Sequence, residues 1–227
     1  MNSKSRDLIN SRTPQKQFIR EQFAFGNHKL QLLKIADLDT LVDTISDDQF
    51  NVDERLPYWA EIWPSAIALS RFIFKNPNLF PKRRILELGC GLGLTSMAIM
   101  LQQPAYFLCS DYEAEALQQA RENFILNEID LPHFQQLDWR DPQIHDSFDV
   151  IIASDILYEK RFFQPLLNLF KNYSAPRGTI IIAEPNRSIA RDFFATLKAR
   201  GYSFSFVCEP VEQGMKTIAV SIYTIQR

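Results

Sequence analysis

The chain has 227 residues, of which 46% are hydrophobic, and this is enough apolar material to bury the core of one α/β domain. Its 25 basic and 27 acidic residues leave a formal net charge of -2, which argues against a nucleic-acid partner held by bulk electrostatics but leaves a local basic patch open. No apolar run approaches the roughly 20 residues of a membrane-spanning helix, and the first residues lack the apolar core of a signal peptide. The composition indicates a globular protein with no membrane partner.

The number and positions of the cysteines indicate the redox state of the cellular compartment. Cys90, Cys109 and Cys208 lie in or beside apolar runs that are typical of strands. Such a sparse, odd set predicts buried thiols in a reducing compartment, so we expect a cytoplasmic protein without disulfides. The three histidines are scattered and no Cys-x-x-Cys pair exists, so nothing in the sequence predicts a metal site.

The N-terminal quarter of the chain differs from the rest. We expect residues 1–16 to form a disordered polar tail; their basic residues also allow an organelle transit peptide, but acidic residues interrupt that pattern. Phenylalanines before Gly26-Asn27 and leucines after it predict a hairpin with a two-residue turn. A short helix over 37–45, capped by Asp37, follows. Residues 17–54 are therefore predicted to be a small hairpin and helix extension of a domain over 55–227.

The next predicted element is a helix that begins at Pro64 and continues through the apolar residues up to about position 73. Trp59 and Trp63 lie just before it. We expect Trp59 to pack in the core. Trp63, at the start of the helix, either packs in the same way or covers a ligand with its indole edge.

Three of the seven glycines, Gly89, Gly91 and Gly93, fall within five positions of one another. They follow a short buried strand at 85–88 and precede an apolar helix over 92–101, so they occupy a strand-to-helix turn. Glycine there tolerates positive φ and lets a ligand approach the main chain, while the helix offers unpaired N–H groups. The alternative is a tight turn without a ligand.

The rest of the chain alternates strands and helices and ends in two strands. The expected strands are 105–109, 134–137, 149–153 and 179–183, the expected helices 113–127, 161–173 and 188–200, and the last two strands 202–208 and 217–225. Too few residues separate the last two strands for a crossover helix, so they should be antiparallel neighbours. Five βα units followed by such a pair predict an α/β fold with a doubly wound sheet.

Polar residues follow four of the expected strands. They are Gly89 to Gly93, Asp111, Asp138 with Trp139, and Ser154 to Tyr158. Ligands of such sheets bind at the carboxyl ends of the strands, so these groups should share one rim. Asp111 lies roughly 20 residues beyond Gly89, the spacing of a carboxylate that binds ribose hydroxyls in Rossmann-like sites. An N-cap for the following helix is the other role open to Asp111, and the two are compatible.

Taken together, the run from Glu87 to Gly93, the acid Asp111 and the terminal strand pair resemble a class I methyltransferase, which uses S-adenosylmethionine and has a Rossmann-like, doubly wound, seven-stranded sheet. The resemblance covers about residue 55 to the end. The run into the helix at Pro64 and the sequence Asp155-Ile156-Leu157-Tyr158 are similar to the protein-lysine methyltransferases with an Asp-x-x-Tyr signature, which include those acting on the electron-transfer flavoprotein β-subunit.

The resemblance implies a role for each matching residue. Glu87, Gly89, Cys90, Gly91 and Gly93 would surround the amino-acid end and sugar of the cofactor, Asp111 would bind its ribose, Trp139 would lie by its adenine, and Trp63 and Ser154 would touch it. Asp155 and Tyr158 would be the catalytic pair that faces a lysine amine of a protein substrate. We further expect a monomer, although the sequence does not itself reveal the oligomeric state.

Three other functions remain open. A small-molecule methyltransferase would share every cofactor residue and differ only in what meets Asp155. A nicotinamide-dependent dehydrogenase would want a glycine at position 94, where the chain has Leu94, and does not explain the closing antiparallel pair. A non-catalytic binding module would not need the intact glycine cluster. The Asp-x-x-Tyr run itself could also be a helix N-cap followed by a packed tyrosine.

Overall fold

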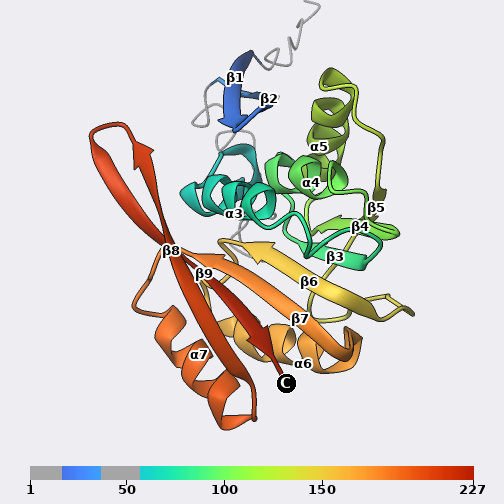
Figure 1. Cartoon of the computed structure of the whole chain (residues 1–227), viewed down its shortest axis with the longest axis vertical. Coiled ribbons are helices and arrows are strands. Elements are labelled where there is room, and N and C mark those ends of the chain that lie inside the picture. Colours follow the sequence, from blue (N-terminus) through green and yellow to red (C-terminus); the bar gives the residue numbers. More distant parts are fainter. Residues whose placement is uncertain (1–16, 37–56) are drawn as a thin grey trace, which may run out of the picture.

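The computed structural model describes residues 17–36 and 57–227, which form a large mixed sheet covered by helices on both faces and a separate N-terminal hairpin (Figure 1). The expected tail over 1–16 and the expected helix over 37–45 lie outside these residues. The strands of the large sheet are β3 (Arg84–Leu88), β4 (Tyr106–Asp111), β5 (His133–Gln136), β6 (Phe148–Ser154), β7 (Ser174–Glu184), β8 (Ser203–Gln213) and β9 (Lys216–Gln226). The helices are α3 (Pro64–Lys75), α4 (Leu94–Met100), α5 (Ala114–Leu126), α6 (Phe163–Tyr173) and α7 (Ala190–Ala199).

The large sheet has seven strands in the order β5-β4-β3-β6-β7-β9-β8. The strands β3 to β7 pair in parallel, whereas β9 runs antiparallel to both β7 and β8. This confirms the expected Rossmann-like, doubly wound sheet with a closing antiparallel pair. The strand order reverses at β3 and β6, and the crevice beyond the carboxyl ends of those strands is where such sheets bind ligands.

Two apolar layers explain why the central strands are apolar throughout. Leu86, Ile151 and Ile180 are buried in one cluster with side chains of α6 and α7. Their direct neighbours Ile85 and Val150 point the other way, into a cluster with α3 and α4. Because successive side chains of a strand alternate between faces, a sheet covered on both faces needs apolar residues at every position.

The N-terminal hairpin consists of β1 (Phe18–Phe25) and β2 (His28–Ile35), joined at Gly26-Asn27 as expected. Asn123 of α5 and Asn127, which follows the end of that helix, hold β2 through its backbone. The Asn127 side chain accepts from the N–H of Gln31 at 2.8 Å and donates to its carbonyl at 2.6 Å, and Asn123 accepts from the N–H of Leu33 at 2.7 Å. Four residues of a helix rise ~6 Å and two residues of a strand about 6.6 Å, so the two spacings match.

The edge strand β8 is longer than expected and corrects one prediction about the cysteines. It continues past Cys208 to Gln213 although Pro210 lies within it, because an edge strand tolerates a residue that cannot donate to a further neighbour. Cys90 and Cys109 are buried as expected, but Cys208 on β8 is exposed. The expectation of a third buried thiol was therefore wrong.

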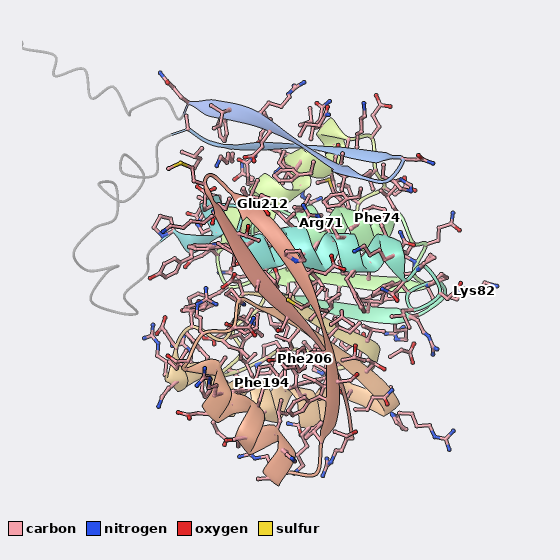
Figure 2. All side chains as sticks on the ribbon, turned by 60° about the vertical axis from the view of Figure 1, so that its left-hand side comes forward. Arg71, Phe74, Lys82, Phe194, Phe206 and Glu212 are labelled. Carbon is pink, nitrogen blue, oxygen red and sulfur yellow. The ribbon has the colours of Figure 1, made fainter. Side chains whose placement is uncertain are left out.

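The β8–β9 hairpin also reaches across α3. The Arg71 side chain donates to the carbonyl of Pro210 at 2.8 Å, and Lys75 pairs with Glu209 at 2.6 Å. In Figure 2 the part of the hairpin that carries Glu212 lies in front of α3, while Phe206 lies toward α7. Within residues 17–36 and 57–227, no helix combines the length and the apolar character that crossing a membrane requires.

Candidate active site

A pocket lies at the carboxyl ends of β3, β4 and β6, beside the reversal of the strand order. Most of the residues predicted for the site contribute to its lining: Trp63, Gly89, Asp111, Trp139, Ser154, Asp155 and Tyr158. The other four, Glu87, Cys90, Gly91 and Gly93, lie in the same strand and turn but not in the lining. The sheet topology thus brings together residues that are far apart in the sequence.

The glycines of the turn have different surroundings. Gly89 lines the pocket with φ of +72°, and a Cβ built on it would lie 3.5 Å from Ile156 Cγ2. Gly93 precedes α4 with φ of +85°, and its Cβ would lie 3.1 Å from the Cβ of Ala120 in α5. Gly89 therefore presents bare main chain to the pocket, whereas Gly93 lets two helices pack closely. The expected helix over 92–101 begins only at Leu94 because Gly93 is left-handed.

Asp111 ends β4, and both of its carboxylate oxygens accept backbone hydrogen bonds. Oδ2 accepts from the N–H of Gly91 at 2.9 Å, and Oδ1 accepts from the N–H of Glu113 at 3.0 Å. Burial raises the pKa of Asp111, and these N–H donors act in the opposite direction. A carboxylate oxygen has more than one lone pair, so each can still accept a ligand hydroxyl.

Glu87 and Cys90 lie beneath the turn. Glu87 is buried within β3 and accepts a hydrogen bond from the hydroxyl of Ser96 in α4. Burial raises the pKa of Glu87 to about 8, and the nearby charge of Asp111 adds to the effect. The thiol of Cys90 is buried as well. A contact of either residue with a ligand stays a prediction, because neither lines the pocket.

The tryptophans differ in their hydrogen bonding. The indole N–H of Trp63 donates to the carbonyl of Tyr58 at 2.8 Å. The indole nitrogen of Trp139 is buried and has no hydrogen-bond partner in the described part of the chain. We expected Trp59 to pack in the core. It packs against Ile35 and Ala60, and it also lines the pocket. A buried donor without a partner costs free energy, so Trp139 indicates a place for an acceptor.

Asp155 follows β6 in the left-handed conformation, with φ of +62°. Its side chain is 7% exposed, and Oδ1 forms an ion pair with Nη2 of Arg187. The other oxygen, Oδ2, is buried without a hydrogen-bond partner among residues 17–36 and 57–227. Asp155 does not cap a helix, since the next helical turn begins at Lys160. Asp155 also lines the pocket, so a carboxylate with one oxygen that lacks a protein partner lies beside the space that a ligand would occupy.

The ring of Tyr158 packs against Tyr58 and Phe162, with ring centroids 5.5 and 6.2 Å apart. Burial raises the pKa of the Tyr158 hydroxyl above its usual range, and the charge of Glu159 adds to this. The hydroxyl therefore stays protonated near neutral pH. It can orient a ligand by a hydrogen bond, but it cannot serve as a base there.

Sequence reasoning did not place Arg187 and Glu184 at the site. Glu184 is the last residue of β7 and is fully buried. It accepts from the N–H of Arg187 at 3.0 Å, and the Nη1 atom lies 3.4 Å from each carboxylate oxygen. Burial raises the pKa of Glu184 to about 7 although Arg187 opposes the shift. Their position at and just after the end of a parallel strand was the one available signal, since no motif marks the pair.

Other lining residues missed by the sequence analysis flank predicted ones along the chain. They are Tyr58, Tyr112, Glu113, Ile156, Glu159, Arg161 and Phe162. Proximity to a strand end was the signal that could have found most of them. In the part of the chain that the structure describes, no group of three or more His, Cys, Asp or Glu side chains is placed to hold a metal ion.

The fold is similar to that of solved proteins, among them several methyltransferases. The chain aligns with a ribosomal protein L11 methylase from Lactobacillus delbrueckii with a TM-score of 0.56 and 17% identity, over 70% of this chain and 77% of the other. It aligns with the magnesium protoporphyrin IX methyltransferase from Synechocystis, solved with bound S-adenosylmethionine, with a TM-score of 0.55 and 17% identity, over 81% and 85%. Likenesses at this identity show the fold alone.

Curated proteins show closer sequence similarity. The chain is 30% identical over 133 residues to the electron transfer flavoprotein beta subunit lysine methyltransferase of Xenopus laevis, over 58% of this chain and 54% of that protein. It is 33% identical over 132 residues to the protein-lysine N-methyltransferase EEF2KMT of Homo sapiens, over 51% and 40%. The chain thus spans about half the length of the curated relatives it matches. Residues 51–200 match the sequence profile of the lysine methyltransferase family, and the chain belongs to this family.

Proposed function

We propose that the protein is an S-adenosylmethionine-dependent N-methyltransferase that methylates a lysine side chain of a protein. The observation that carries the proposal is the buried, unpartnered oxygen of Asp155 in the same pocket as Gly89 and Asp111. A substrate amine could donate a hydrogen bond to Asp155, and a nucleoside could bind at Gly89 and Asp111. Membership of the lysine methyltransferase family supports the choice of substrate.

The pocket residues fit the cofactor. Gly89 leaves main chain open to it, the Asp111 carboxylate has spare lone pairs for ribose hydroxyls, and the buried N–H of Trp139 lacks an acceptor. Trp63 and Ser154 complete its surroundings, while Glu87, Cys90, Gly91 and Gly93 shape the turn that receives it. Bound there, S-adenosylmethionine would supply an electrophilic methyl group on a sulfonium. We place this catalytic domain at residues 55–227, with an extension at 17–54.

The residues on the other side of the pocket would bind the lysine. Only the neutral amine has a free lone pair, and neutralising a lysine of pKa about 10.4 at pH 7 costs about 4.6 kcal/mol. Asp155 would accept an N–H of the amine and aim it, with the protonated Tyr158 hydroxyl as a second orienting group. The proton that the lysine ammonium must lose would pass to water. Correct positioning then supplies most of the rate, since an aligned geometry is worth ~7 kcal/mol or more.

The proposal is tested with the purified chain, labelled S-adenosylmethionine and a lysate of its own source cells, followed by mass spectrometry of the labelled bands. We expect a labelled protein with the methyl group on a lysine. Label confined to the small-molecule fraction would overturn the protein substrate.

A variant of the site sharpens this experiment. Asp155→Ala should abolish transfer while cofactor affinity stays within a few-fold of wild type. The matched control is Asp192→Ala, which removes an exposed carboxylate on α7. Loss of cofactor binding together with transfer in Asp155→Ala would contradict the role given to Asp155.

We further propose that the protein acts as a cytoplasmic monomer without bulk nucleic-acid binding. The net charge of -2 supports the lack of bulk nucleic-acid binding, and the buried free thiols Cys90 and Cys109 support a reducing compartment. Light scattering after size-exclusion chromatography tests the monomer, and imaging of the tagged chain in its source cells tests the compartment.

A further inference from the structure

The guanidinium of Arg187 lies between two buried carboxylates at neighbouring strand ends. Asp155 follows β6 and Glu184 ends β7, and these strands pair in parallel through Ser154 and Ala183. Nη2 of Arg187 pairs with Asp155, while Nη1 and the backbone N–H face Glu184. A planar guanidinium with five donors can bind two carboxylates at once, which a lysine ammonium does less well.

We propose that Arg187 is a positioning residue for Asp155: it orients the carboxylate toward the substrate amine, offsets its charge, and affects methyl transfer only through Asp155. This rests on the proposed lysine methyltransferase activity and goes further by assigning a role to a residue outside the pocket lining.

The orienting role follows from the two oxygens of Asp155. Arg187 binds Oδ1, and Oδ2 is left buried without a partner. The main chain at this position is held as well, because the N–H of Asp155 donates to the carbonyl of Ala183 at 3.0 Å. Because the main chain and Oδ1 of Asp155 are both held, the direction in which Oδ2 points is fixed. Without Arg187 the carboxylate would rotate, and catalysis that depends on aim would suffer.

The charge role follows from the chemistry of the amine. An isolated carboxylate would favour the ammonium form of the bound lysine, which cannot accept a methyl group. A guanidinium on the other side of Asp155 weakens that preference, while the carboxylate keeps its hydrogen-bonding oxygen. Removal of Arg187 should therefore leave substrate binding nearly intact, or tighten it, while the rate of the chemical step falls.

Arg187 is itself held from the far side. Glu184, which is fully buried, accepts the backbone N–H of Arg187 and lies within 3.4 Å of its Nη1. Glu184 thus fixes the guanidinium without reaching the pocket lining. Glu184 thus orients Arg187, and Arg187 in turn orients Asp155 at the pocket.

The test compares Arg187→Ala and Arg187→Lys with the matched control Arg191→Ala, which removes an exposed arginine four positions further along. The substrate is the purified protein of the labelled band, and kcat, KM and cofactor affinity are measured for each variant. Arg187→Ala should lower kcat at least tenfold, with KM unchanged or lower and cofactor affinity within twofold. Arg187→Lys should recover part of the loss, and Arg191→Ala should match wild type.

Two further readouts separate positioning from a merely structural role. Guanidinium ion at millimolar concentration should restore part of the activity of Arg187→Ala and none of that of Asp155→Ala. In an Asp155→Asn background, Arg187→Ala should cause no further loss of kcat.

Failure of the positioning role of Arg187 can be distinguished from failure of the proposed methyltransferase activity. If wild type transfers methyl groups and Arg187→Ala has wild-type kcat, or if Arg187→Ala costs a further tenfold in the Asp155→Asn background, the positioning role is overturned and the activity stands. If wild type transfers no methyl group to any protein, both proposals fail.

Discussion

The backbone N–H of Gly91 donates a hydrogen bond of 2.9 Å to Oδ2 of Asp111. The acid that ends β4 thus holds the glycine turn that follows β3. The two sequence signals that first pointed to a nucleotide-like ligand are therefore parts of one structure. A change in either one should alter both stability and cofactor binding.

Asp111→Asn tests this coupling. The N–H groups of Gly91 and Glu113 bond to different oxygens of Asp111, so in an asparagine one of them would face the amide NH2, which is a donor, and would lose its acceptor. Loss of a hydrogen bond to a charged group costs about 1.5–3 kcal/mol, so we expect a drop of that order in the unfolding free energy. Cofactor affinity, measured by calorimetry, should fall at least tenfold. Asp130→Asn, at an exposed position, is the control and should change neither.

Gly93→Ala should be more destabilising than Gly201→Ala. The two glycines have nearly equal φ, +85° and +83°, so an alanine is strained at both, by about 1–2 kcal/mol. At Gly93 the added Cβ would also meet Ala120 at 3.1 Å, whereas nothing lies within 4 Å at Gly201. Overpacking should cost a further 1–3 kcal/mol at Gly93. Urea denaturation measures the difference, and equal costs would show that helix packing does not constrain Gly93.

Glu87→Gln should change how stability depends on pH. Burial raises the pKa of Glu87 from 4.5 to about 8, so the folded protein binds this proton more tightly than the unfolded chain. Its contribution to stability is present at low pH and is lost as pH rises from about 4.5 through about 8. A neutral glutamine avoids this loss and can still accept from Ser96.

The measurement is the melting temperature of wild type and Glu87→Gln from pH 5 to pH 9. The melting temperature of the variant should rise relative to that of wild type as pH rises. In a domain of this size, each kcal/mol of unfolding free energy shifts the melting temperature by ~2–4 °C. Glu184, whose pKa is also raised, to about 7, remains in both proteins and shifts both curves in the same direction. Parallel curves would contradict the raised pKa of Glu87.

Asn127→Ala should loosen the N-terminal hairpin. The asparagine makes two hydrogen bonds to the backbone of Gln31, and no other side chain bridges that residue to α5 in the described ranges. Losing them should cost about 1–3 kcal/mol and speed amide exchange over 29–34. Hydrogen exchange read by mass spectrometry checks this. Gln118→Ala, on the exposed face of the same helix, should leave the exchange unchanged.

The fold was largely predictable because its signals are local. A continuous apolar run such as that of β6 indicates a strand covered on both faces, and Pro64 marks a helix start. The extent of β8 was not predictable. Pro210 argues against a strand in the sequence, and only the position of β8 at the sheet edge makes it acceptable.

The sequence by itself determined that this chain forms a doubly wound sheet and that a glycine turn and Asp111 meet at one rim, because strand period and turn chemistry depend on neighbouring residues. Only the tertiary structure decided which of these residues line the pocket and that Arg187 pairs with Asp155. The residues of that ion pair are brought together by the parallel pairing of β6 and β7. Contact across strands depends on register and burial, and neither can be read from a single local pattern.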